Sequence, residues 1–130
     1  MLTLTLISLF VNLDRPATIQ ARLRRCFEAI CQVESGGNPR AINRKEDAVG
    51  IAQIRPCMVA EANRVLGRRK YGLGDRLSVE RSWEIFRLYS RYYAPNGPEE
   101  TWARNWQGGP HGHKKPCTLA YWQKVKEILE

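Results

Sequence analysis

Glu34 occupies the position in this sequence that is best suited to acid catalysis. It follows Leu23, Phe27 and Ile30 at intervals of eleven, seven and four residues, so it continues the apolar face of one helix. A carboxyl group there loses hydration and lies in the last helical turn, where the macrodipole is negative. Both effects raise its pKa, as a general acid working near neutral pH requires. The alternative is a glutamate that is solvated at a helix end or paired with an arginine.

Two further acids, Glu46 and Asp47, precede Gly50 in a loop. A second carboxylate that faces the acid across a cleft could act as a base and activate a water molecule. Either residue fills that role if it faces Glu34. The alternative is a pair of solvated loop charges, because acidic side chains are mostly exposed.

The elements that position these residues are mainly helices. Apolar residues at intervals of three and four predict helices from Ile19 to about Ser35, from Pro56 to before Gly67, from Val79 to about Tyr93, from Glu99 to Asn105, and after Thr118. Glycines and prolines make residues 36–55 irregular or thinly β. A chain of 130 residues with this pattern is one mostly helical domain.

Four short motifs resemble those of the lytic transglycosylase and goose-type lysozyme superfamily, and they occur in the family's order between residues 20 and 130. They are Glu34-Ser35-Gly36-Gly37-Asn38-Pro39, Gly50-Ile51-Ala52-Gln53 followed by Pro56, Arg104-Asn105-Trp106-Gln107-Gly108-Gly109, and Tyr121 on the last helix. Two positions depart from the family pattern: Ala52 stands where a methionine is usual, and Arg104 stands where an aromatic residue is usual.

The resemblance implies a lysozyme-like α+β fold, with helices around a glycan-binding cleft. It implies cleavage of the β-1,4 bond between N-acetylmuramic acid and N-acetylglucosamine, with Glu34 as general acid and then base. Formation of an anhydro-muropeptide by the substrate's own 6-hydroxyl is the favoured outcome, and hydrolysis as in a muramidase is the alternative.

The resemblance also implies the substrate-binding residues. Gln53 and Asn105 bind the sugar, Ser35 matches the family motif, and Tyr121 holds Glu34 in place. Among the tryptophans, Trp106 is the best candidate for substrate contact, because it falls within the expected turn from Asn105 to Gly109. We expect no metal and no cofactor: His111 and His113 lack further ligands nearby.

The net charge of +8 favours a polyanionic partner, and the anionic cell wall is one such partner. A nucleic-acid-binding helical module and a non-catalytic cell-wall-binding module are the alternatives. The irregular stretch from 36 to 56 is too long for the turn of a helix-turn-helix motif, so we expect no nucleic-acid binding. The protein is expected to be a monomer that acts outside the cytoplasm or at the cell wall, as a remodelling enzyme, a secretion accessory or a phage-encoded lysin.

The first residues, 1–16, form a separate apolar segment ahead of the domain at 17–130. This segment is too short to span a membrane as a helix, and both a signal peptide and a packed extension remain open. The four cysteines, Cys26, Cys31, Cys57 and Cys117, are expected to be buried free thiols, with disulfide pairing open. A bridge between Cys26 and Cys31 is disfavoured, because their spacing places them on different helix faces.

Overall fold

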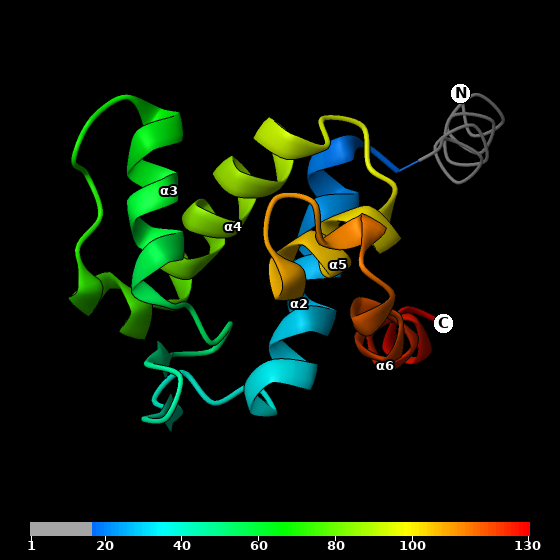
Figure 1. Ribbon diagram of the computed structural model, residues 1–130, viewed down its shortest axis with the longest axis horizontal. Helices are drawn as coiled ribbons and strands as arrows, with labels where there is room; N and C mark the ends of the chain where they lie inside the picture. Colours follow the sequence, from blue (N-terminus) through cyan, green and yellow to red (C-terminus); the bar gives the residue numbers. More distant parts are fainter. Residues whose placement is uncertain (1–16) are drawn as a thin grey trace, which may run out of the picture.

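The computed structural model describes residues 17–130, so the expected N-terminal segment 1–16 lies outside the described residues. Five α-helices, a two-stranded sheet and three 3-10 helices follow one another within that range (Figure 1). In chain order they are α2 (Ile19–Ser35), β1 (Ile42–Asn43), β2 (Ala48–Val49), α3 (Pro56–Leu66), η1 (Leu73–Leu77), α4 (Val79–Tyr93), α5 (Glu99–Gly108), η2 (Gly112–Lys114), η3 (Pro116–Thr118) and α6 (Leu119–Leu129). The fold is mostly helical with a small sheet, which confirms the expected α+β class.

The helix ends follow the local signals in the sequence. Gly36 ends α2 with a left-handed φ of 63°, and Gly67 ends α3 in the same way. Ser78 begins α4, where its hydroxyl accepts a hydrogen bond from the Arg81 amide. One expectation was wrong: α5 does not end at Asn105 but continues to Gly108, so the expected turn at 105–109 is mostly helix.

The core forms where α2 packs against α4, α5 and α6, while α3 packs on α4 (Figure 1). Aromatic rings from three helices meet in it: Phe27 of α2 lies 5.5 Å from both Trp83 and Phe86 of α4, and Phe86 meets Trp106 of α5 edge-on at 5.3 Å. Burying such rings supplies much of the hydrophobic stabilisation of a small domain. The middle of α2, about two turns before Glu34, is therefore anchored in this aromatic core.

The two strands pair antiparallel, with Ile42 opposite Val49 and Asn43 opposite Ala48. They form a short hairpin that joins α2 to α3 at one end of the molecule (Figure 1). Within residues 17–130, no helix is both long and apolar enough to cross a membrane.

All four cysteines are free thiols, but only Cys26 and Cys31 are buried, whereas Cys57 and Cys117 are exposed. The expectation of buried thiols was therefore right for one pair and wrong for the other. Burial raises the pKa of the Cys31 thiol to about 12, so it stays protonated and acts as a small apolar side chain.

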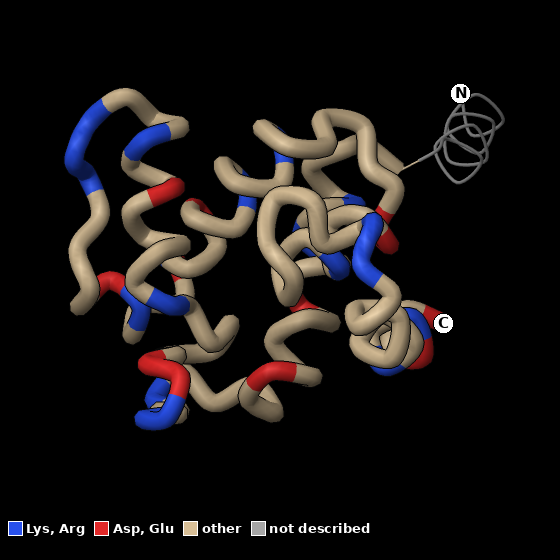
Figure 2. Tube along the Cα trace, in the orientation of Figure 1, with Lys and Arg blue, Asp and Glu red and all other residues tan. Residues whose placement is uncertain are grey.

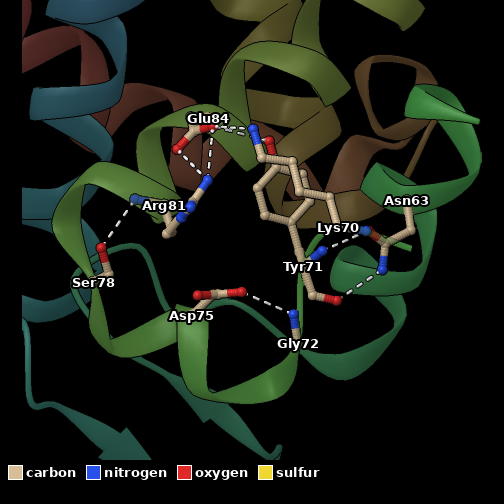
Figure 3. Close-up of polar contacts among 8 residues, drawn as sticks. All are labelled: Asn63, Lys70, Tyr71, Gly72, Asp75, Ser78, Arg81 and Glu84. Atoms are coloured by element: carbon tan, nitrogen blue, oxygen red, sulfur yellow. Dashed lines mark hydrogen bonds and ion pairs between the residues drawn. The ribbon is translucent and has the colours of Figure 1, made fainter. Parts of the chain in front are cut away.

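A polar network fixes the long connection between α3 and α4. Glu84 of α4 is its centre: it accepts hydrogen bonds from Lys70 at 2.9 Å and from the Tyr71 hydroxyl at 3.2 Å. The side-chain amide of Asn63 in α3 makes two hydrogen bonds with the Tyr71 backbone. Its nitrogen donates to the Tyr71 carbonyl oxygen, and its oxygen accepts from the Tyr71 N–H. The network comprises Asn63, Lys70, Tyr71, Gly72, Asp75, Ser78, Arg81 and Glu84 (Figure 3). It holds η1 in one position between the two helices.

Arg76 of η1 connects this part of the fold to the hairpin through hydrogen bonds. Its side chain is only 9% exposed, and it donates to the backbone oxygens of Leu73 at 3.0 Å, Asp47 at 2.9 Å and Ile54 at 3.2 Å. Gly50 allows the close approach, because a Cβ at its φ of 90° would lie 1.7 Å from the Arg76 carbonyl oxygen. The hairpin is therefore fastened to the rest of the fold by a buried guanidinium group.

Arg76→Gln is expected to lower the free energy of unfolding by about 3 kcal/mol, because buried carbonyl oxygens lose their charged donor. Arg81→Gln is the matched control. Arg81 is 41% exposed, and within residues 17–130 its side chain bonds Glu84 alone, so its replacement should cost less than about 1 kcal/mol. Urea unfolding of both variants measures the difference, and equal losses would contradict the role assigned to Arg76.

Candidate active site

A pocket of about 200 Å³ opens where the end of α2, the hairpin, the start of α3 and the end of α5 converge. Acidic and amide side chains from α2, the hairpin region and α5 face it, and Arg55 and Met58 come from the start of α3. Its lining residues are Glu34, Asn43, Glu46, Ala48, Gln53, Arg55, Met58, Trp106 and Gln107. Glu34, Gln53 and Trp106 were expected at a substrate site, and the fold brings them together around one cavity.

Glu34 is half-buried, and its pKa is raised from 4.5 to about 7. Burial is the largest cause, and the nearby negative charge of Glu46 adds to it, while Arg55 opposes both. The raised pKa predicted from the helix pattern is therefore confirmed. A carboxyl group with this pKa holds a proton up to neutral pH and can deliver it to a leaving group.

Only one of the two loop acids reaches the pocket. Glu46 lines it, where its carboxylate pairs with Arg55 at 3.3 Å. Asp47 turns away, with a left-handed φ of 50°, and its 61% exposed side chain pairs with Arg76 at 3.3 Å. The pocket therefore holds two carboxyl groups, Glu34 and Glu46, with Arg55 beside them.

Gln53 and Ser35 shape the loop that borders the pocket. Gln53 has a left-handed φ of 52°, and its side-chain amide donates to the carbonyl oxygens of Gly50 and Ala41. Its own amide oxygen accepts no hydrogen bond from residues 17–130 and is free for a ligand. The Ser35 hydroxyl lies 2.7 Å from the Ile51 carbonyl oxygen, which ties the end of α2 to this loop. Ser35 does not line the pocket.

Trp106 and Asn105 are adjacent in the last turn of α5, but their side chains point in different directions. Successive residues in a helix point about 100° apart, so Trp106 and Gln107 face the pocket while Asn105 faces the interior. The Asn105 amide oxygen accepts from the His113 backbone at 2.9 Å, and the residue is 2% exposed. Trp106 is 4% exposed and donates to the Ala52 carbonyl oxygen, so it forms a wall rather than a projecting platform. The Asn105 side chain thus stabilises the turn that contains His113 and does not face the pocket.

The two departures from the family pattern fall on buried positions outside the pocket. Ala52 is fully buried under Trp106. Arg104 is nearly buried and donates to the Thr118 hydroxyl at 2.8 Å and to the Lys115 carbonyl oxygen at 3.1 Å. Arg104 therefore joins α5 to the segment before α6.

Tyr121 of α6 is buried close enough to Glu34 to be affected by its charge. It is 5% exposed, and its hydroxyl has no hydrogen-bond partner among the residues that the structure describes. Burial raises its pKa well above 10, and the charge of Glu34 contributes to the rise. The two groups are therefore neighbours, although no hydrogen bond joins them.

The sequence did not single out Asn43, Arg55, Met58 or Gln107, although all four line the pocket. Arg55 lies two residues after the motif residue Gln53, and Gln107 lies inside the motif at 104–109, so both carried a usable signal. Asn43 and Met58 carried none, since their placement depends on how the hairpin and α3 meet.

A second, more apolar pocket of about 210 Å³ adjoins the first. The two share Arg55, Met58, Trp106 and Gln107, and the second continues along α3 past Cys57 to Glu61. The shared residues make the pockets parts of one extended groove.

The raised pKa of Glu34 predicts how stability depends on pH. Between pH 4.5 and about 7 the folded chain keeps a proton that the unfolded chain releases, so this contribution to stability is complete below 4.5 and is lost as pH rises through 7. Glu34→Gln cannot ionise. It is expected to be more stable than the wild type at pH 8 by up to about 3 kcal/mol, and nearly equal at pH 4.5. Urea unfolding at both pH values measures this, and a difference independent of pH would contradict it.

Comparisons with known proteins agree with this fold. Residues 15–94 match the family model of the transglycosylase SLT domain. The chain is 30% identical over 122 residues to invertebrate-type lysozyme 6 of Caenorhabditis elegans, covering 79% of this chain and 84% of that protein.

A chain in the crystal structure of Aeromonas hydrophila PliI in complex with Meretrix lusoria lysozyme superposes with a TM-score of 0.68 at 26% identity. That superposition covers 81% of this chain and 88% of the other. The family match spans more than half of the sequence and includes both Glu34 and Glu46. This chain belongs to the transglycosylase SLT domain family, within the lysozyme-like superfamily.

Proposed function

We propose that this protein cleaves the β-1,4 bond between N-acetylmuramic acid and N-acetylglucosamine in peptidoglycan, with Glu34 as general acid and Glu46 as the second carboxylate. The observation that carries the proposal is a half-buried Glu34, with a pKa of about 7, in one pocket with a carboxylate paired to Arg55. Lysozyme is the established example of a glycosidase whose catalytic glutamic acid has its pKa raised by an apolar environment.

The chemistry divides between the two carboxyl groups. Glu34 gives its proton to the glycosidic oxygen as the bond to the anomeric carbon breaks. Glu46 either attacks that carbon to form a covalent intermediate, which water then hydrolyses with Glu34 as base so that the configuration is retained overall, or it activates a water molecule that attacks the carbon directly and inverts the configuration. Arg55 contacts the Glu46 carboxylate at 3.3 Å and so orients it at the pocket.

The groove supplies the binding groups. The free amide oxygen of Gln53 accepts a hydrogen bond from the sugar or its N-acetyl N–H, and the wall formed by Trp106 packs against the apolar face of the ring. The second pocket extends the contact to a neighbouring sugar. Ser35 and Tyr121 act by positioning Glu34 and its loop. Asn105 is not among the proposed ligands, because its amide oxygen is already bonded to His113.

Transglycosylation is the second candidate, and the match to the transglycosylase SLT domain favours it. In that reaction the 6-hydroxyl of the muramic acid attacks its own anomeric carbon, so the enzyme needs Glu34 alone. The presence of Glu46 in the pocket favours hydrolysis.

Mass spectrometry of the soluble products from purified peptidoglycan tests the proposal. Hydrolysis yields reducing muropeptides, whereas transglycosylation yields 1,6-anhydro products that are lighter by one water. Glu34→Gln is the control that must release neither. If the wild-type protein releases no fragments where a known muramidase does, the proposed activity is contradicted.

The proposal also gives the place of action. The substrate lies outside the cytoplasm, so we propose that the protein works at the cell wall, as a monomer whose groove is complete within one chain. Its net charge of +8 attracts it to an anionic wall.

A further inference from the structure

Two cations project from the turn of the hairpin at the edge of the active-site pocket. Arg44 and Lys45, which we call the hairpin tip, stand between Asn43 and Glu46, and both of those residues line the pocket. Both tip residues are exposed, and neither has an ion-pair partner among residues 17–130. In Figure 2 the hairpin shows positive and negative residues in direct succession. The tip therefore presents two uncompensated positive charges beside the site of cleavage.

The backbone holds the tip in place. The Asp47 amide donates to the Arg44 carbonyl oxygen, and the Glu46 amide donates to the Asn43 side chain, both at 3.4 Å. Directly after the tip, buried Arg76 binds the Asp47 carbonyl oxygen. The cations thus keep a fixed position relative to Glu46, although their side chains extend into solvent.

The charge pattern of pocket and tip selects a particular kind of ligand. Among its lining residues the pocket offers an anion no unpaired cation, because Arg55 is paired with Glu46, whereas the tip presents two. A polymer with a charge on every unit, such as a nucleic acid, would place negative charge inside the pocket. A strand that is neutral where it fills the pocket and anionic beside it satisfies both regions. Peptidoglycan has this pattern, because its sugar backbone is neutral while the peptides that branch from the N-acetylmuramic acid units carry carboxylates.

We propose that Arg44 and Lys45 bind the carboxylates of the peptide side chains on the glycan strand. The enzyme then distinguishes peptide-bearing peptidoglycan from a bare glycan of the same sugars. This inference rests on the proposed function and assigns it a substrate class.

The test compares two double variants that remove the same charge. Arg44→Gln/Lys45→Gln removes the tip, and Arg68→Gln/Arg69→Gln removes an exposed basic pair after α3. The control pair lies at the far end of α3 from the hairpin, as Figure 2 shows for the positive loop. Each protein is assayed for kcat/KM on soluble peptide-bearing glycan strands and on the same strands after an amidase has removed the peptides and the lactyl carboxylates that this exposes have been converted to neutral methylamides.

The tip variant is expected to lose about fivefold in kcat/KM on peptide-bearing strands and nothing on bare strands, with the effect shrinking in high salt. The control variant should lose little on either substrate. Equal losses by the tip variant on both substrates, no loss on either, or a control loss as large as that of the tip, would overturn the inference. If the wild-type protein cleaves neither substrate, the proposed function itself fails. If it cleaves both kinds of strand at equal rates, the proposed function stands and the inference about the hairpin tip fails.

Discussion

Replacing Glu34 with Gln is expected to reduce the rate of glycan cleavage by about 10³-fold or more while leaving the fold intact. The substitution keeps the size of the side chain and removes the proton that the leaving oxygen needs. Substrate binding should change little, because the amide fills the same half-buried position. The kcat of wild type and variant on soluble glycan strands, with binding of the same strands measured separately, separates loss of chemistry from loss of affinity.

Glu28→Gln is the matched control for this experiment. Glu28 lies on the same helix, is 61% exposed and pairs with Arg24, so its replacement removes one charge without reaching the pocket. It should retain nearly full activity. An active Glu34→Gln variant would show that another group supplies the proton.

The pH profile gives independent evidence on the same residue. Because the acid must be protonated, wild-type kcat/KM is expected to fall as pH rises through about 7, the pKa of Glu34. A profile that stays flat from pH 6 to 9 would remove Glu34 from the role of acid.

Replacing Glu46 with Gln is expected to reduce kcat by about 100-fold if the enzyme hydrolyses its substrate, because the attacking or water-activating carboxylate is gone. The variant should also shift the pH profile. Glu46 raises the pKa of Glu34, so its removal lowers that pKa, and the alkaline fall of kcat/KM begins at lower pH. The two effects are read from one set of rates measured across pH.

Asp47→Asn is the control for Glu46→Gln, since it removes the same charge from the adjacent residue. Asp47 lies outside the pocket and bonds Arg76, and an asparagine retains an oxygen for that contact. It should keep nearly full activity. If Glu46→Gln also keeps full activity while its products carry the anhydro ring, the substrate supplies its own nucleophile and transglycosylation is the reaction.

Much of the local structure was determined by the sequence. The helix periods, the glycines at the ends of α2 and α3, and Ser78 at the start of α4 all depend on neighbouring residues. The placement of Glu34 on an apolar stripe is also local, and for that reason its raised pKa was predictable before the fold was known. The length of α5 was not, because its last turn is stabilised by packing of Trp106 against α4 rather than by a local signal.

The tertiary structure decided which of several plausible residues share the pocket. Glu46 and Asp47 are adjacent in sequence, yet Arg76, 29 residues after Asp47, turns Asp47 away and leaves Glu46 beside Arg55. Asn105 and Trp106 are likewise adjacent, and one faces His113 while the other reaches Ala52, 54 residues earlier. The sequence by itself thus determined the helices and the acid. The choice of the second carboxylate and of the groove's walls depended on contacts between distant segments, which no local pattern encodes.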